Sequence, residues 1–362
     1  MSRALVFLLK PLTSLLLAFH PFLAFRAKLQ PYPGWHMGSW ASDSGIHRRV
    51  IKEEVWKHCK GRRVIPWWND LCVYVYPGNE TSRALLLSGL YEPNEFYWLS
   101  SNLMPGQTFI DVGANMGLYT IFAARKVGSS GAVIAIEPST RDFARLKANV
   151  ELNKLVNVQL LQVALSDHEG EAELLVATEE HSGHNTLGDF GYATASQGTE
   201  RVHVTRLDDI VKQLALTRID VIKIDVEGAE YVTLRGAEDT LRRFKPSILL
   251  EISDRTLVHQ GASGSKVWDF LIQRGYSIRV FHKKTGLPSQ EVKPSYFDSE
   301  NAIATRDNST HTNEMTQRGR SKTFATLRLG YAVSGPDDGM RRIRTACSTD
   351  HWCRVITRPA RG

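Results

Sequence analysis

Apolar and amphipathic segments alternate along the chain from about residue 108 onward. Five short apolar runs predict β-strands, at residues 108–112, 132–136, 158–163, 221–224 and 247–252. The segments between them have helical spacing of apolar positions, over residues 118–127, 141–153, 229–243 and 265–274. Strands that alternate with helices are typical of βαβ units. We therefore expect an α/β fold with a doubly wound, mostly parallel sheet.

Two further strand-like segments interrupt this alternation between the third and fourth strands. Residues 172–176 and 202–205 predict an inserted hairpin, and the polar loop 179–200 lies between them. We expect this loop to approach the substrate. Before the first strand, residues 35–105 are rich in Trp and Tyr and contain a strand-like piece at 71–76. They predict a cap that precedes the main domain.

The ends of the chain have a different character from its centre. We divide the sequence into residues 1–34, an apolar or amphipathic N-terminal segment; 35–105, the cap; 106–303, the main domain; and 304–362, a poorly ordered basic tail. The apolar runs of the first 25 residues are interrupted by Lys10, Pro11, His20 and Pro21, so no clean run of roughly 20 apolar residues spans a membrane. An amphipathic surface segment, a disordered tail and a start-site artefact stay open; a spanning helix or signal peptide is less favoured.

Composition narrows the class of protein. Hydrophobic residues make up 42% and charged residues 23%, as in ordinary globular proteins. The net charge of +7 is not arranged as a basic stripe interleaved with aromatic residues, so we expect no nucleic-acid partner. The four cysteines form no CxxC pair, which argues against a zinc site or a disulfide framework. A reducing, cytoplasmic location fits best, with association to a membrane surface through residues 1–25 left open.

The most informative segment runs from Thr108 to Gly117, where an apolar strand leads through a glycine turn into a helix. Ligands of doubly wound sheets bind at such turns. Gly113 lets a ligand approach the backbone, and Gly117 permits close entry into the helix. Asn115 stands where another glycine is often found, and Asn tolerates the left-handed conformation. Asp111 either binds the ligand or caps the turn.

Glu137 supplies the second part of a cofactor site. It ends the second strand, about 20 residues beyond the glycine turn, where an acidic residue suits a ribose diol; a helix cap is the alternative. The dinucleotide pattern G-x-G-x-x-G fails at both Asn115 and Leu118. The methyltransferase pattern acid-x-Gly-x-Gly-x-Gly fails only at Asn115. We therefore favour S-adenosyl-L-methionine over a nicotinamide dinucleotide.

Candidate catalytic residues follow the fourth strand. Lys223 and Asp225 lie on one face of it, and a lysine in an apolar strand needs a partner, for which Asp225, Glu137 and Glu251 are candidates. One interpretation is a buried ion pair that organises the strand ends. The other is that Asp225 faces the cofactor and substrate while Glu227 acts as base or binds the acceptor. Glu251 adds a third carboxylate at this edge.

The polar loop contributes candidate substrate contacts. We expect His184 and Asn185, together with Glu251, to bind substrate, and His181 to lie on the surface. No histidine stands at ligand spacing from the three carboxylates, so we expect no metal ion.

Together these motifs resemble the FkbM family of methyltransferases, over roughly residues 88–303. The similarity is carried by Tyr91-Glu92-Pro93, Asp111 to Thr120, Glu137-Pro138, Ala164 to Asp167, Arg206 to Ile210 and Lys223 to Glu230. The resemblance implies a Rossmann-like class I methyltransferase fold and O-methylation of a sugar or small-molecule hydroxyl. It also implies that Asp111, Gly113 and Glu137 contact the cofactor, with Ser166 and Asp167 beside its adenine. Arg206 departs from the family, which more often has Thr there.

Three other readings stay open. A nicotinamide-dependent oxidoreductase and a non-catalytic interaction protein on a methyltransferase fold are the principal ones. A nucleic-acid methyltransferase is disfavoured, because no Asn/Asp-Pro-Pro-aromatic tetrapeptide follows the fourth strand. The sequence does not identify the acceptor or the oligomeric state.

Overall fold

The computed structural model describes residues 52–54, 56–89, 91–192, 194–281, 286–290 and 293–306. The chain divides into two units after Arg306. The predictions made for residues 1–34 and for the tail beyond 306 lie outside the described residues. Among the helices that are described, none has the length and apolarity needed to cross a membrane. The cytoplasmic location stays a prediction.

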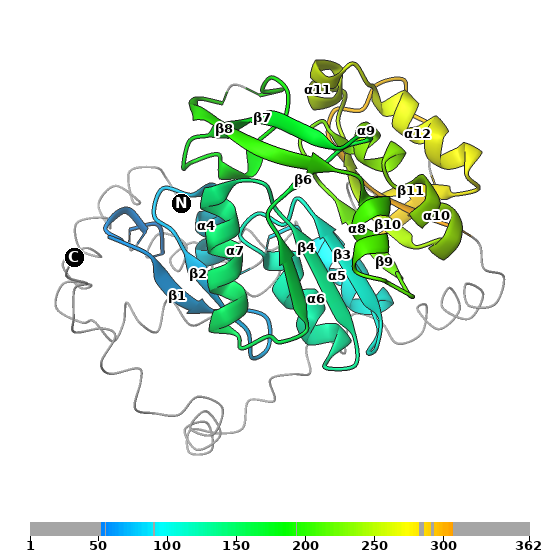
Figure 1. The fold of residues 1–362 in the computed structure, drawn as a ribbon. Helices are drawn as coiled ribbons and strands as arrows, with labels where there is room; N and C mark the ends of the chain where they lie inside the picture. The colour runs from blue at the N-terminus through cyan, green and yellow to red at the C-terminus, as the bar shows by residue number, and fades with distance from the viewer. Residues whose placement is uncertain are drawn as a thin grey trace. The chain divides into compact units, whose positions relative to one another are not determined.

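An eight-stranded sheet forms the centre of the fold, in the order β12-β11-β13-β10-β9-β3-β4-β5 (Figure 1). Its parallel core consists of β3 (Thr108–Val112), β4 (Ala132–Ile136), β5 (Val158–Leu161), β9 (Val221–Ile224) and β10 (Ser247–Ile252). The five strands predicted from the sequence are these five. The chain moves outward from β3 to β5 and returns on the other side of β3 to form β9. This reversal creates a switch point at the carboxyl ends of β3 and β9, where ligands of such sheets bind.

The far edge of the sheet is antiparallel. β13 (Glu300–Thr305) lies between β10 and β11 (Ser277–Phe281) and runs against both, and β12 (Pro288–Gln290) pairs with β11. The sequence pattern did not predict these strands. β13 also continues to Thr305, two residues past the expected domain boundary, because Ala304 and Thr305 pair with Ile278 and Ser277.

Apolar side chains cover both faces of the sheet. Adjacent residues of a strand belong to different hydrophobic clusters, one on each face of the sheet. Phe109 and Val221 belong to the first cluster, whereas Ile110 and Ile222 belong to the second. This alternation is the period of two of a β-strand, applied to a sheet buried on both sides. The helices that contribute to the first cluster are α4 (Glu80–Ser88), α5 (Pro93–Asn102), α6 (Leu118–Val127) and α7 (Thr140–Leu152). Those that contribute to the second are α8 (Leu207–Gln213), α9 (Glu230–Arg235), α10 (Glu238–Phe244), α11 (Asp254–Leu257) and α12 (Gly264–Gln273).

The helix expected over residues 229–243 is interrupted, so that part of the prediction was wrong. α9 ends at Arg235, Gly236 is its C-cap, and α10 begins at Glu238. A Cβ atom on Gly236 would stand 2.0 Å from the carbonyl oxygen of Ser166. The chain therefore needs glycine at this close approach.

The cap packs into the same core as the sheet. The described part of the cap comprises a hairpin of β1 (Arg63–Pro66) and β2 (Cys72–Val75), followed by the helices α4 (Glu80–Ser88) and α5 (Pro93–Asn102). The Asn79 side chain caps α4 by accepting a hydrogen bond from the Ser82 N–H, at 2.8 Å. Phe96 is fully buried, with its ring stacked 4.3 Å from that of Tyr119 and edge-on at 5.2 Å to Phe122. The described part of the cap and the first helix after β3 thus share one hydrophobic cluster.

The insert forms a small separate sheet, as the hairpin prediction implied. β7 (Gly170–Ala177) and β8 (Ser196–Thr205) are antiparallel, and the short β6 (Ala164–Leu165) lies parallel to β8. The loop between β7 and β8 contains a 3-10 turn, Ser182–His184. Its Asn185 side chain donates to buried Asp142 of α7 at 2.7 Å and accepts from the Ala177 N–H at 3.0 Å, which fastens the loop to the main domain.

Candidate active site

A cavity of about 590 Å³ opens at the carboxyl ends of β3, β4, β9 and β10, the position of the switch point. The predicted site residues that line it are Gly113, Asn115, Glu137, His184, Asn185, Lys223, Asp225, Glu227 and Glu251. The lining that the sequence reasoning did not single out includes Glu80, Tyr91, Glu92, Tyr119, Val163, Ala164, Leu165, Ser182, Tyr192 and Asn301. The cap, the insert and the sheet therefore all contribute to one cavity.

The glycine turn after β3 lies tightly against the turn after β9. Gly113 has φ +77°, and a Cβ atom there would stand 1.8 Å from the Asp225 carbonyl oxygen. The N–H groups of Gly113 and Ala114 both donate to the Ile136 carbonyl at 3.0 Å. Asn115 adopts the left-handed conformation expected of it, with φ +50°. Gly117 begins α6, and a Cβ on it would stand 2.5 Å from the Leu146 side chain.

Asp111 lies beneath this turn and is absent from the cavity lining in the described part of the chain. Its carboxylate accepts a 2.5 Å hydrogen bond from the Thr120 hydroxyl, while its second oxygen has no hydrogen-bond partner among the described residues. Burial raises the pKa of Asp111, and the positive charge of Lys223 opposes that rise. The negative charge of Asp111 therefore stabilises the positive charge of Lys223.

Glu137 holds the glycine turn to the end of β4. Its two carboxylate oxygens accept hydrogen bonds from the N–H groups of Asn115, at 2.8 Å, and Ser139, at 2.9 Å. Burial and the nearby charge of Asp142 raise its pKa to about 8. Glu137 also lines the cavity, and its contact with a ligand stays a prediction.

Ser166 and Asp167 lie behind the wall of the cavity. Asp167 lies in hydrogen-bond contact with His168, at 3.0 Å, and forms an ion pair with Arg235, at 3.2 Å. The wall itself at this end is apolar and comes from Val163, Ala164 and Leu165. The placement of Ser166 and Asp167 beside an adenine stays a prediction.

Lys223 and Asp225 form the expected ion pair. Nζ of Lys223 lies 3.0 Å from a carboxylate oxygen of Asp225 and 4.8 Å from the centre of the Tyr119 ring. Burial alone would lower the pKa of Lys223, but Asp225, Asp111 and Glu92 outweigh it and raise the pKa. Lys223 therefore stays charged at the base of the cavity.

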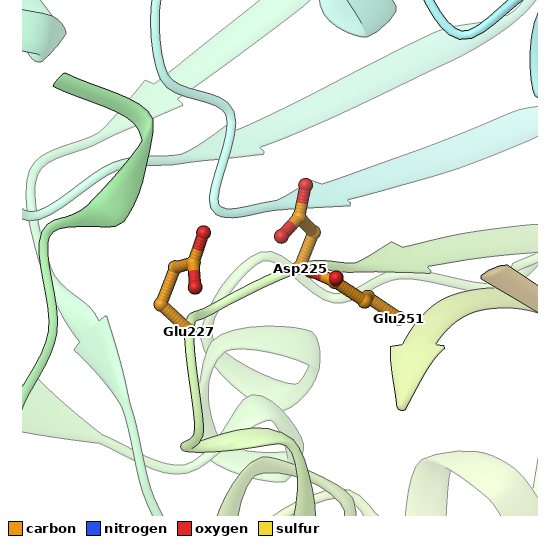
Figure 2. Close-up of side chains that lie close together, drawn as sticks. All are labelled: Asp225, Glu227 and Glu251. Carbon is orange, nitrogen blue, oxygen red and sulfur yellow. The ribbon is translucent and has the colours of Figure 1, made fainter. Parts of the chain in front are cut away.

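Three carboxylates meet beside this pair (Figure 2). Asp225 and Glu227 follow β9, Glu251 belongs to β10, and one oxygen of each lies within 4.8 Å of the others. Burial, followed by the charges of Glu251 and Asp225, raises the pKa of Glu227. Burial and Asp225 raise that of Glu251 to about 7, and the Ser299 hydroxyl donates to Glu251. The spacing is one that a metal ion could occupy.

Glu92 is a site residue that the sequence reasoning missed. It has φ +44° immediately before α5, and its carboxylate accepts a 2.6 Å hydrogen bond from the Tyr119 hydroxyl. Burial and Asp225 raise its pKa to about 8. The Tyr91-Glu92-Pro93 motif was a signal for this site, but only the packing of the cap on α6 shows that it reaches the cavity.

The insert loop forms the outer wall. The His184 ring stacks on His181, with 5.5 Å between ring centres, and lies 5.0 Å from Tyr192. His184 also contacts the Thr194 hydroxyl at 3.1 Å, and burial lowers its pKa, so the ring is neutral at pH 7. His181, expected on the surface, lines the cavity as well. Asn185 uses its amide to anchor the loop.

The strand order, with a single reversed strand between β10 and β11, and the cavity at the switch point are those of a doubly wound α/β fold with a ligand site. The family described as "Methyltransferase FkbM domain" matches residues 111–278.

Several relatives share this region. The chain is 30% identical over 167 residues to "Methyltransferase 1" of Beauveria bassiana, and 31% identical over 163 residues to the 31-O-demethyl-FK506 methyltransferase FkbM of Streptomyces tacrolimicus. These matches cover 41% and 38% of the chain, and 66% and 62% of the relatives. A match of 27% identity to the AMB antimetabolite synthetase AmbE of Pseudomonas aeruginosa covers 49% of the chain and 10% of that protein. The chain thus spans less than two thirds of these relatives' lengths.

Proposed function

We propose that this chain transfers a methyl group from S-adenosylmethionine to a hydroxyl group of a sugar or another small molecule. The observation that carries the proposal is the joining of the glycine turn to Glu137 through the Asn115 N–H, at the switch point of a domain that matches the FkbM methyltransferase family. The same arrangement disfavours a dinucleotide, since the turn lacks the glycines that cradle a pyrophosphate.

The residues of the cavity suit each part of this cofactor. Gly113 leaves the space that a Cβ atom would fill. Glu137 is placed to accept hydrogen bonds from a ribose diol, and Val163, Ala164 and Leu165 offer an apolar surface to the adenine. The carboxylates around Asp225 supply the negative potential that a sulfonium cation requires. When bound, the cofactor supplies a methyl group already activated for transfer.

The protein's part in the reaction is orientation and removal of a proton. Glu227 takes the proton of the acceptor hydroxyl as the new oxygen–carbon bond forms and the carbon–sulfur bond breaks, with the electron pair left on sulfur. A base with a raised pKa is effective near neutral pH, and such a base typically contributes about 10²- to 10⁴-fold. Asp225, fixed by Lys223, orients the reacting groups, and the insert loop excludes water. Positioning supplies up to about 7–11 kcal/mol of the barrier.

Two measurements test the proposal. Calorimetric titration of the purified full chain with S-adenosylmethionine and, in parallel, with NAD and NADP should show binding of the first only. Incubation with methyl-labelled S-adenosylmethionine and a panel of sugars and hydroxylated metabolites should then transfer label to oxygen. Binding of a nicotinamide dinucleotide in place of S-adenosylmethionine would establish the oxidoreductase reading, and binding without any transfer would favour a non-catalytic role.

A further inference from the structure

The turn between β9 and α9 holds Glu227 in an unfavourable position. Glu227 has φ +49° and Gly228 has φ +107°. A left-handed backbone is costly for a residue with a side chain, and the Glu227 carboxylate also faces two other carboxylates that repel it. Without restraint the turn would relax and carry Glu227 toward solvent. Other groups must therefore hold it in place.

Glu230 restrains the turn from the helix side. Its side chain is only 2% exposed, and it reaches back from the first turn of α9. One carboxylate oxygen accepts hydrogen bonds from the N–H groups of Val226 and Gly228, both at 3.1 Å, and the other accepts from Gly228 at 3.0 Å. The two N–H groups are those on either side of Glu227. Such charge-assisted bonds are among the stronger ones in proteins.

Thr186 restrains the turn from the insert. It is 3% exposed, and its hydroxyl donates to the Glu227 carbonyl at 2.8 Å while accepting from the Gly188 N–H at 3.1 Å. On the remaining side the turn lies against α11, because a Cβ on Gly228 would stand 2.6 Å from the Thr256 carbonyl oxygen. The peptide unit after Glu227 is thus fixed by both side chains, and Glu230 also holds the peptide unit that links Asp225 to Val226.

We infer that Glu230 and Thr186 are positioning residues that direct the Glu227 carboxylate toward Asp225 and Glu251. Within the described residues, neither lines the cavity, so each acts only through the turn. The inference rests on the proposed function for the role of Glu227, whereas the restraint of the turn stands on the hydrogen bonds themselves. The inference assigns a role to Glu230, the second glutamate of the motif from Asp225 to Glu230.

The restraint is tested by hydrogen exchange at single amides. In the full chain, Glu230→Ala should speed exchange of the Val226 and Gly228 N–H groups by about tenfold or more, because each loses a charged acceptor. Glu230→Gln keeps one carbonyl oxygen and should show a smaller increase. Thr186→Val keeps the shape of the side chain and should loosen the same turn. Glu238→Gln, in the first turn of neighbouring α10, is the control and should change neither amide.

Turnover then separates positioning from a purely structural role. With an acceptor found in the labelled-methyl screen, Glu230→Ala and Thr186→Val should lower kcat by at least about tenfold, leave the KM for S-adenosylmethionine within twofold, and shift the acidic limb of the pH profile; Glu230→Gln should restore part of kcat. Unchanged amide exchange in the Glu230 and Thr186 variants would overturn the restraint. Faster exchange with unchanged kcat and pH profile would overturn positioning.

The design also separates this inference from the proposed function. Should the unaltered protein fail to bind S-adenosylmethionine, the proposed function falls, while the exchange measurement still decides whether the two side chains hold the turn. Should Glu230→Ala fail to fold, Thr186→Val and Glu230→Gln carry the same test.

Discussion

The main-chain N–H of Asn115 donates a 2.8 Å hydrogen bond to the Glu137 carboxylate, and this bond joins the segments that follow β3 and β4 at the cavity. The left-handed backbone of Asn115 turns the N–H toward β4. A carboxylate so placed organises the glycine turn.

At about pH 9, above the raised pKa of Glu137, replacing Glu137 with Gln should weaken S-adenosylmethionine binding by about 10- to 150-fold, the equivalent of about 1.5–3 kcal/mol for hydrogen bonds that involve a charged group. Isothermal titration calorimetry measures the change. Glu151→Gln, on the exposed side of α7, is the matched control and should bind as the unaltered protein does. Equal affinity of the two variants would remove Glu137 from the cofactor site.

Replacing Gly113 with Ala should abolish cofactor binding, because the new methyl group would collide with the Asp225 carbonyl oxygen, 1.8 Å away. Gly128→Ala separates this collision from backbone strain. Gly128 also has positive φ, +68°, but a Cβ there meets no atom within 4 Å. The control should therefore lose only about 1–2 kcal/mol of stability and bind normally. Normal binding by Gly113→Ala would contradict the close packing of the two turns.

Asp225→Asn and Glu227→Gln should each reduce turnover by about 10²- to 10⁴-fold while cofactor affinity stays measurable. The first change weakens the ion pair with Lys223, and the second removes the proposed base. Rates with a labelled methyl donor and calorimetry on the same preparations provide the comparison. Glu173→Gln, exposed on β7, controls for the loss of one negative charge. Full turnover in both variants would eliminate the base assignment.

The unliganded protein should lose stability as the pH rises from about 5 to 8. Burial raises the pKa of Glu251 and Glu230 to about 7 and that of Glu137 to about 8, from 4.5. The folded state therefore holds protons that the unfolded state releases, so their stabilising contribution is complete below pH 4.5 and is lost as the pH passes through the folded values. Thermal midpoints measured across this range should fall less steeply for Glu251→Gln than for the unaltered chain. Identical slopes would mean that Glu251 titrates normally.

Chelation should leave the reaction intact. Lys223 already balances Asp225, and the Ser299 hydroxyl already donates to Glu251, so two of the three carboxylates have partners without an ion. Prolonged dialysis against EDTA should change turnover by less than about twofold. Loss of activity that returns with Mg²⁺ or Mn²⁺ would instead show that Asp225, Glu227 and Glu251 bind a metal.

The sequence predicted the parallel strands and the glycine turn well, because each depends on a local pattern. Runs such as Phe109-Ile110 and Val221-Ile222 need only a period of two and burial on both faces. β13 was not predicted, because its position between β10 and β11 depends on pairing with residues that are distant in the sequence.

The site was predicted only in part for the same reason. Glu137, Asp225, Glu227 and Glu251 follow apolar strands, so the fold class brings their strand ends together. Glu92 reaches the cavity only because Phe96 stacks on Tyr119, a contact between separate helices. Glu230 looks from its sequence like an ordinary first-turn acid; its bonds to Val226 and Gly228 exist only in the folded turn.

The burial of Phe96 between Trp67, Tyr119 and Phe122 also bears on how this protein can be shortened or recombined. A fragment that began at residue 106 would keep every strand of the large sheet and still expose an aromatic face of α6 to water. Fusions or truncations that aim at an active, soluble catalytic unit should therefore retain the chain from β1 onward, because the first helices complete the interior that supports Tyr119 and, through it, Lys223.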